Sequence, residues 1–97
     1  ATALITNSDH LAHVVYAVAA GRGVRIPGDL SVVGHDDLPT SALLAPPLTT
    51  LAVDRRAIGV TAAGLLIDAL AGRPPATRDV SLPTTLLVRG STAPPPR

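Results

Sequence analysis

Residues 29–37 read Asp-Leu-Ser-Val-Val-Gly-His-Asp-Asp, a short apolar run that ends in a glycine, an imidazole and two carboxylates. Such a run predicts a buried strand of a parallel sheet at Leu30 to Val33, followed by a polar tip at His35–Asp37. In open α/β sheets, ligands bind just beyond the carboxyl ends of the strands. Asp36 and its neighbours are therefore the first candidates for a functional site.

Length and composition limit what this chain can be. Its 97 residues make at most one small domain, and Tyr16 is the only aromatic residue, so a core must be built from Ala, Val, Leu and Ile. The absence of cysteine excludes disulfides, and a net charge of +1 is too small to create a nucleic-acid-binding face. Because there is no membrane span and no charged signal-peptide start, we expect a soluble chain, with the cytoplasm as the default compartment.

A second polar tip precedes the first helix. Residues 3–6 form a short apolar run that opens into Asn-Ser-Asp at 7–9, and Ser8 or Asp9 can cap the helix predicted over 10–20. The order strand, helix, strand predicts a βαβ unit with parallel strands. Parallel strands end on the same edge of a sheet, so the two polar tips should face each other.

The longest predicted element is a second helix. It runs from about Arg55 to Leu70, with Asp54 as its N-cap and Gly72 as its C-terminal stop before two prolines. Gly59 and Gly64 weaken an isolated helix, which predicts close packing against another backbone. The apolar stripe that we expect to be buried consists of Ile58, Ala62, Leu65, Leu66 and Ala69.

Shorter elements lie on either side of this helix. Residues 40–44 could form one helical turn, and residues 48–53 a short extended piece. The alternation over 80–89 predicts a last strand, in which Pro83 marks an edge or a bend. The proline-rich tail, residues 91–97, is expected to be disordered.

The residues of the polar tips also allow a metal site or an acid/base site, and their arrangement disfavours both. A metal site from Asp9, His10, His13 and His35 has unsuitable spacing, and the alternative is exposed helix histidines. An acid/base site from His35, Asp36 and Asp37 is disfavoured because adjacent residues of an extended tip point in opposite directions. The chain also carries no nucleophile elbow or phosphate-binding glycine loop. We therefore expect no enzyme, no metal and no cofactor.

A binding role requires fewer specialised residues than a metal site or an acid/base site. The Asp36 carboxylate can accept two hydrogen bonds at once, which suits the vicinal hydroxyls of a sugar or the N–H edge of a base. Asn7 and Ser8 on the facing tip could add donors and acceptors. For Asp9 and Asp37, the alternative that they cap a helix or satisfy a turn is at least as good.

Three stretches, residues 6–12, 23–37 and 46–51, resemble in order and spacing the C-terminal part of LacI/GalR-type transcription repressors. Asp54 and Ile58-Gly59 extend the resemblance, which covers nearly the whole chain. It implies an α/β fold, a three-layer α/β/α periplasmic-binding-protein-like arrangement with mainly parallel strands and two Rossmann-like lobes. An effector would bind in the cleft between the lobes, and this chain would hold only part of the fold.

The resemblance also implies how the chain is divided. Residues 1–48 would form the C-terminal lobe βαβ unit, and residues 49–78 the crossover and long helix of the N-terminal lobe. Residues 79–90 would return as a strand to the C-terminal lobe, before the tail at 91–97. The DNA-reading domain is not among these residues, so operator DNA would be bound only through a missing N-terminal domain.

Site residues follow from the same resemblance. It implies an effector contact at Asp36 and another at Ser8 or Asp9, so the expected ligand-binding set is Asn7, Ser8, Asp9, His35 and Asp36. The family usually has Tyr or Phe at the position of His35, where a histidine could bond the ligand or make binding sensitive to pH. The implied dimer interface comprises His13, Tyr16, Ala17, Leu43 and Leu44.

The predicted function is the effector-binding and dimerisation fragment of a LacI-type DNA-binding transcriptional regulator, with a small sugar-like ligand. The alternative is a secreted sugar-binding transport receptor of the same fold. Ile58, Leu65 and Leu66 would lack their usual neighbours, so we expect a homodimer or a segment-exchanged oligomer. No membrane partner is expected.

Overall fold

The computed structural model describes residues 1–73 and 79–97. The chain divides into two compact units, of which unit 1 comprises Ala1–Val53 with Thr85–Arg97 and unit 2 comprises Asp54–Thr84. The proline pair predicted to follow the long helix, Pro74-Pro75, lies outside the described residues, as does the end of the predicted segment 49–78.

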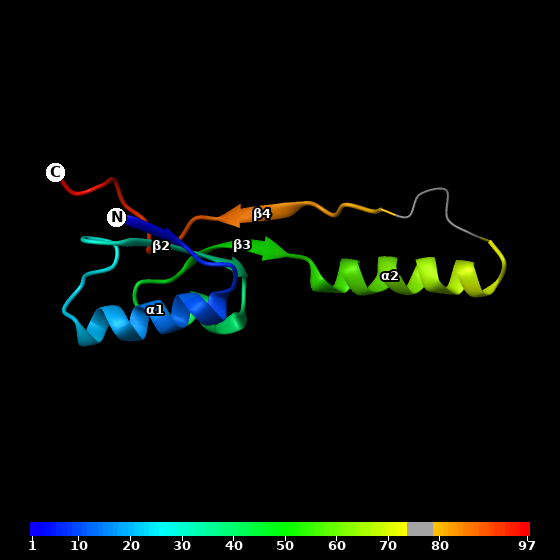
Figure 1. Ribbon diagram of the computed structural model, residues 1–97, viewed down its shortest axis with the longest axis horizontal. Helices are drawn as coiled ribbons and strands as arrows, with labels where there is room; N and C mark the ends of the chain where they lie inside the picture. Colours follow the sequence, from blue (N-terminus) through cyan, green and yellow to red (C-terminus); the bar gives the residue numbers. More distant parts are fainter. Residues whose placement is uncertain (74–78) are drawn as a thin grey trace. The chain divides into compact units, whose positions relative to one another are not determined.

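Unit 1 begins with the predicted βαβ arrangement. Strands β1 (Ala3–Ile5) and β2 (Ser31–Asp36) pair in parallel, and helix α1 (Asp9–Gly21) connects them. Figure 1 shows α1 lying along one face of this sheet. Ser8 is the N-cap of α1, and Gly23 takes a positive φ of 69° where the chain turns after the helix.

The sheet has four strands in the order β1-β2-β3-β4. After the 3-10 helix η1 (Pro39–Leu43), strand β3 (Thr49–Val53) pairs in parallel with β2. Strand β4 (Thr84–Leu87) lies next to β3, and its arrow points the opposite way in Figure 1. The predicted α/β class with mainly parallel strands is confirmed, and the carboxyl ends of β1, β2 and β3 share one edge.

Two strands differ most from their predicted ranges. Strand β2 does not end at Val33 but continues to Asp36, because His35 and Asp36 pair with Leu51 and Ala52 of β3. Strand β4 is shorter than the predicted 80–89 and begins directly after Pro83, whose nitrogen cannot donate to a sheet.

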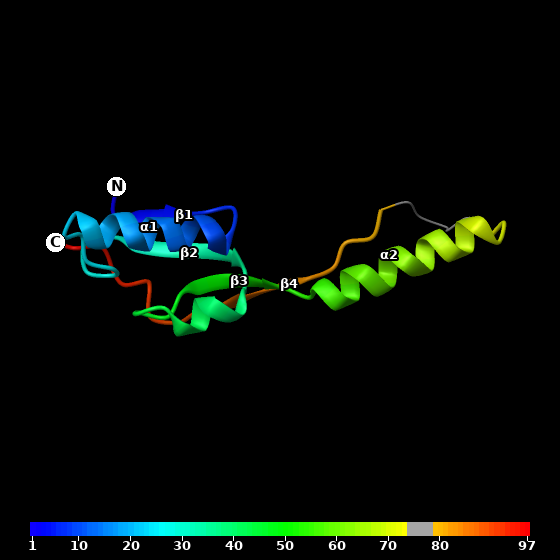
Figure 2. The ribbon, with the colours of Figure 1, turned by 90° about the horizontal axis from the view of Figure 1, so that it is seen from below.

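The apolar core of unit 1 is small. Its fully buried members are Ala12 of α1, Val32 of β2 and Leu48, which precedes β3. Five partly buried side chains pack against them: Val15, Tyr16, Ile26, Leu30 and Leu44. Figure 2 shows α1, β1 and β2 side by side from below, in agreement with this packing. Since small side chains bury little area, buried hydrogen bonds carry much of the specificity of this fold.

The prediction that residues 91–97 are disordered is wrong for the start of the tail. Ser91 is fully buried, and its Oγ donates to the Val32 carbonyl at 2.6 Å and accepts from the Thr49 amide at 2.8 Å. Ala93 exchanges two hydrogen bonds with the Ser31 side chain. The proline content had suggested a free tail, but the hydroxyl of Ser91 bridges two strands.

Unit 2 contains helix α2 (Arg55–Leu70), which begins at the predicted N-cap Asp54 and is followed by Gly72 with φ of 73°. None of its residues is buried, so the predicted buried stripe of Ile58, Ala62, Leu65, Leu66 and Ala69 is not buried in this chain. Among the residues that the structure describes, nothing lies within 4 Å of a Cβ built at Gly59 or Gly64, so the expected close backbone packing is not seen there. Among residues 1–73 and 79–97, no helix has the length and hydropathy of a membrane span.

Candidate functional site

The tip of β2 has backbone geometry that side chains rarely adopt. Asp36 has a φ of 118° and Asp37 a φ of 55°, both in the left-handed region that favours glycine. A non-glycine residue held there costs on the order of 1–3 kcal/mol, and such strain clusters at binding and switching sites. The chain therefore keeps two carboxylates at a place where glycine would be less strained.

His35 and Asp36 are paired at this tip. The imidazole Nδ1 lies 3.1 Å from Asp36 Oδ1, and the side chains are 38% and 35% exposed. Consecutive residues of a regular strand point to opposite faces, and the sequence predicted that here. That expectation was for Asp36 and Asp37, and their partners do differ, since Asp37 pairs with Arg89. The positive φ of Asp36 departs from regular strand geometry, and its carboxylate lies beside the His35 ring.

Asp37 fastens the end of β2 to the segment that follows β4. Its Oδ1 accepts a hydrogen bond from Arg89 Nη2 at 2.7 Å. The same guanidinium donates through Nη1 to the Leu48 carbonyl at 3.0 Å, and the Arg89 amide donates to Thr49 Oγ1 at 2.9 Å. This arrangement agrees with the alternative that Asp37 holds its loop.

Asp9 lies inside the protein, at the first turn of α1, and its residue exposure is 0%. Its Oδ1 accepts from Thr50 Oγ1 at 2.7 Å. Its Oδ2 accepts from Ser41 Oγ at 2.5 Å and from the Leu38 amide at 2.9 Å. We call these four residues the Asp9 network. It joins α1, the loop after β2, η1 and β3 beneath the edge where the polar tips meet.

The Asp9 network keeps this carboxyl ionised. Burial by itself raises the pKa of Asp9, but the hydrogen bonds from Ser41, Thr50 and the Leu38 amide outweigh burial, and the pKa lies below its ordinary value of 3.8. The positive end of the α1 dipole stabilises a negative charge at the same position. A fully buried carboxylate with three donors is thus held as an anion, and the charge of the nearby His13 lowers its pKa further.

The structure explains why residue 34, in the stretch 29–37, is a glycine. A Cβ at this position would lie 2.2 Å from Asp9 Oδ1 and 2.9 Å from Leu48 Cδ2. No side chain fits at that distance, and the Asp9 carboxylate cannot retreat without leaving its donors. Glycine here makes room for the Asp9 network against β2.

The first polar tip contributes two residues nearer the surface. Asn7 is exposed, and Ser8 is half-buried, with its Oγ accepting from the Leu11 amide at 3.3 Å. The Thr6 hydroxyl donates to the Ser8 carbonyl at 2.8 Å and lies 3.2 Å from the Val33 carbonyl, which ties this tip to β2. Of the predicted ligand-binding set, Asn7, Ser8, His35 and Asp36 are accessible, whereas Asp9 is enclosed.

The residues predicted to form a dimer interface come from α1 and from η1 with the residue after it. Ala17 and Leu43 are exposed, Leu43 by 82%, while His13, Tyr16 and Leu44 are half-buried. His13 Nε2 lies 3.4 Å from Ser41 Oγ, and the Tyr16 hydroxyl donates to the Pro46 carbonyl at 2.8 Å. Burial raises the pKa of Tyr16, although a hydrogen bond with Ser91 opposes that shift.

Four structural residues of this region were not predicted from the sequence: Ser41, Thr50, Arg89 and Ser91. Each is a polar residue in or beside an apolar or proline-rich stretch, and each is bonded to a residue more than 30 positions away. For Ser41, Thr50 and Ser91 the available signal is a hydroxyl within a largely apolar or proline-rich stretch, and this signal does not identify the bonding partner. Within the described residues, no group of three or more potential metal ligands comes together.

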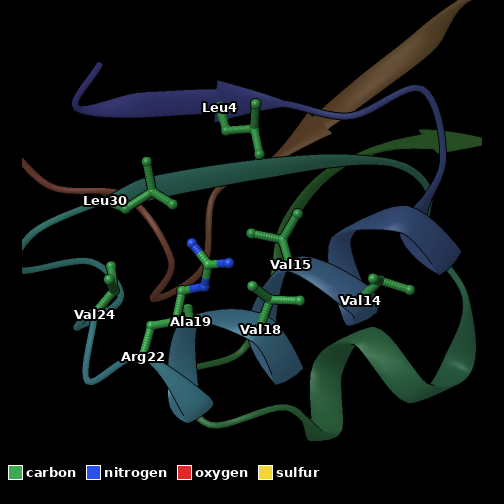
Figure 3. Close-up of a pocket in the computed structure, with 8 residues that line it drawn as sticks. All are labelled: Leu4, Val14, Val15, Val18, Ala19, Arg22, Val24 and Leu30. Atoms are coloured by element: carbon green, nitrogen blue, oxygen red, sulfur yellow. The ribbon is translucent and has the colours of Figure 1, made fainter.

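A separate apolar groove of about 300 Å³ lies between β1 and α1 in unit 1. Figure 3 shows the side chains that line it, with Arg22 as the one charged residue among them. The others are Leu4, Val14, Val15, Val18, Ala19, Val24 and Leu30. The groove contains none of the predicted ligand-binding residues, and its lining offers few partners for sugar hydroxyls.

Comparison with known proteins finds similarity to a domain family and to curated repressors. The periplasmic binding protein-like domain family matches residues 1–92. The lactose operon repressor of Rhizobium radiobacter is 36% identical over 89 residues, which cover 92% of this chain and 78% of that protein. The chain spans 27% of the length of other curated repressors that it matches at 35% identity.

Solved structures resemble this chain over nearly all of its length. A LacI family transcriptional regulator from Enterococcus faecalis V583, with bound ribose, has a TM-score of 0.89 at 33% identity and is matched over 97% of this chain and 35% of its own. The lac repressor dimer bound to operator and the anti-inducer ONPF has a TM-score of 0.86 at 33% identity, over 94% of this chain and 32% of its own. The chain therefore spans about a third of the length of these two proteins.

Proposed function

This chain belongs to the LacI/GalR-type transcriptional regulators of the periplasmic binding protein-like domain family, and we propose that it is an effector-binding and dimerisation fragment of such a regulator. Its ligand is a small sugar or a related polyhydroxylated molecule. The observation that carries the proposal is the strained Asp36, whose accessible carboxylate lies at the sheet edge where the adjacent parallel strands β1 and β2 end.

The proposed ligand contacts are Asp36 and His35 on the second tip, with Asn7 and Ser8 on the first. Vicinal hydroxyls of a sugar can donate to a carboxylate and accept from the N–H groups of an amide, which are the groups that Asp36 and Asn7 offer. Asp9 is left out of the ligand contacts, since both of its oxygens are bonded inside the protein. Ribose bound to one relative and the lactose operon name of another support a sugar as the ligand.

In this proposal the ligand regulates a DNA-binding protein in the cytoplasm. Binding would favour one arrangement of the two lobes, and the shift in population would reach DNA-reading domains outside residues 1–97. The named relatives are repressors, which favours this role over a transport receptor or an enzyme. Operator DNA would be contacted through those other domains, and no cofactor takes part.

Substitution of Asp36 tests the ligand site. In the intact regulator, Asp36→Ala is expected to weaken binding of the sugar by about 10- to 100-fold, because charged hydrogen bonds contribute about 1.5–3 kcal/mol. Calorimetry with a panel that includes ribose, lactose and nucleobases measures this change. Asp29→Ala removes an exposed carboxylate whose partner is Arg25 and is expected to leave affinity unchanged. Equal affinity of Asp36→Ala and the parent protein would remove the central claim.

The proposal includes self-association of this chain. Unit 1 exposes apolar residues on its edge strand and first helix, with Ile5 at 76% and Val14 at 57%, and the groove of Figure 3 lies between these elements. Leu43, on the proposed dimer interface, is 82% exposed, more than any other large hydrophobic residue that the structure describes. Such surfaces are rarely left open to water.

Light scattering on the chain at tens of micromolar is expected to give a dimer or a larger, segment-exchanged oligomer. Leu43→Glu should shift the population toward monomer, since a buried charge opposes association. The matched control is Leu70→Glu on α2, an equally exposed leucine outside the proposed interface, which should leave the mass unchanged. A clean monomer of the parent chain at this concentration contradicts the proposal.

A further inference from the structure

We propose that His35 is a pH-dependent gate on the ligand site, in which the protonated imidazole engages the Asp36 carboxylate and competes with the hydroxyl groups of a neutral sugar. The inference rests on the proposed role of Asp36 as a ligand contact and adds the regulation of that contact. A phenylalanine at the position of His35 could not regulate binding in this way, because its side chain does not bind a proton.

The geometry supports competition between the ring and a ligand for one carboxylate. His35 Nδ1 lies 3.1 Å from Asp36 Oδ1, within hydrogen-bond reach, and both side chains are about one-third exposed, at 38% and 35%. A ligand at this edge therefore approaches a carboxylate that already has the imidazole beside it.

Two other acidic groups at this edge, Asp37 and Asp9, have partners of their own. Asp37 is paired with Arg89, and Asp9 lies beneath the surface with Ser41, Thr50 and the Leu38 amide. The residues of β3 opposite the pair are Leu51 and Ala52, which carry no charge. On the side of the first tip, Asn7 and Ser8 are neutral. Asp36 is accordingly the acidic group that the structure places against the His35 ring.

The direction of the pH effect follows from the two states of the ring. Histidine is the side chain that ordinarily changes its charge between pH 5 and 8. A protonated ring forms a charge-assisted bond with Asp36, which withdraws lone pairs that a sugar hydroxyl would otherwise meet. A neutral ring holds the carboxylate less strongly. Affinity for a neutral sugar should therefore fall as the pH falls.

The experiment measures sugar affinity of the intact regulator by calorimetry at about pH 8 and about pH 5.5, with ribose as the first probe and lactose as the second. Because exposed ion pairs are weak, we expect affinity to fall by about two- to fivefold at the lower pH. His35→Gln keeps a neutral hydrogen-bonding side chain and should bind with nearly equal affinity at both pH values. His10→Gln changes an exposed histidine of α1 and should keep the full pH dependence.

The outcomes separate this inference from the proposed function. If Asp36→Ala lowers affinity while His35→Gln retains the pH dependence of the parent protein, the gate is wrong and the ligand site stands. Tighter binding at the lower pH likewise overturns the gate, since the ring would then assist the ligand. If Asp36→Ala leaves affinity unchanged, the proposed site itself fails, and any pH dependence has another origin.

Discussion

Replacing Asp9 with alanine is expected to lower the free energy of unfolding by about 3–5 kcal/mol. The substitution removes the shared acceptor of the Ser41 and Thr50 hydroxyls and the Leu38 amide, all in a buried region. Each buried donor left without a partner costs about 1–3 kcal/mol, and the hydroxyls recover part of that by rotating. Domains of this kind have only about 5–15 kcal/mol of stability, so the loss is severe. Urea denaturation followed by circular dichroism measures it.

Two further variants serve as controls for the Asp9→Ala prediction. Asp9→Asn preserves the volume and one carbonyl oxygen, so it should retain a cooperative transition and lose about half as much stability. Asp68→Ala removes a carboxylate of α2 whose partner is the exposed Arg73, and it should change stability by less than about 0.5 kcal/mol. An Asp9→Ala protein within 1 kcal/mol of the parent would falsify the role assigned to the Asp9 network.

Acid should reproduce part of the Asp9 effect. The pKa of Asp9 in the folded protein lies below its ordinary value of 3.8, so its ionised form adds stability above that value. This contribution is lost as the pH falls below about 4 and through the folded-state pKa, where the carboxyl group takes up a proton. The stability of Asp9→Asn should accordingly fall less steeply between about pH 5 and pH 2 than that of the parent chain.

Gly34→Ala is expected to be the second most damaging substitution, at about 2–4 kcal/mol. The added methyl group would meet Asp9 Oδ1 at 2.2 Å and Leu48 Cδ2 at 2.9 Å. Overpacking of a core costs about 1–3 kcal/mol, and displacement of the carboxylate from its donors adds to that cost. Thermal or urea unfolding of the variant gives the value.

The control for Gly34 comes from the same chain. Nothing lies within 4 Å of a Cβ at Gly64, so Gly64→Ala on α2 should raise stability by about 0.5–1 kcal/mol. The double variant of Asp9→Ala with Gly34→Ala should lose less than the sum of the two single losses, since the methyl group occupies space that the carboxylate leaves. Strict additivity of the two changes contradicts the close contact.

Local patterns in the sequence were sufficient for most of the fold. The helix of residues 55–70 was predicted with its N-cap at Asp54, because a capping side chain and a following glycine act within a few residues of the helix ends. The apolar run before Gly34 predicted a parallel strand, because a short hydrophobic pattern is likewise a local property of the sequence. The end of β2 was missed, because its last residues are held by pairing with β3, which is remote in sequence.

The candidate site was predictable in its location but not in its roles. The sequence left Ser8 and Asp9 open as contacts and expected neighbouring side chains at the second tip to diverge. Burial separates the first two, since Asp9 is enclosed while Ser8 stays near the surface. The positive φ of Asp36 brings its carboxylate to His35, and no pattern of residue types announces that angle.

The sequence by itself determined the α/β class, the order of the elements and the edge where the polar tips meet, because hydrophobic periodicity and capping are local. Only the tertiary structure decided that Asp9 serves the interior, that Gly34 exists to accommodate it, and that Ser91 joins two strands instead of trailing in solvent. These roles depend on hydrogen bonds between residues more than 20 positions apart, and their partners become known only when the chain has folded.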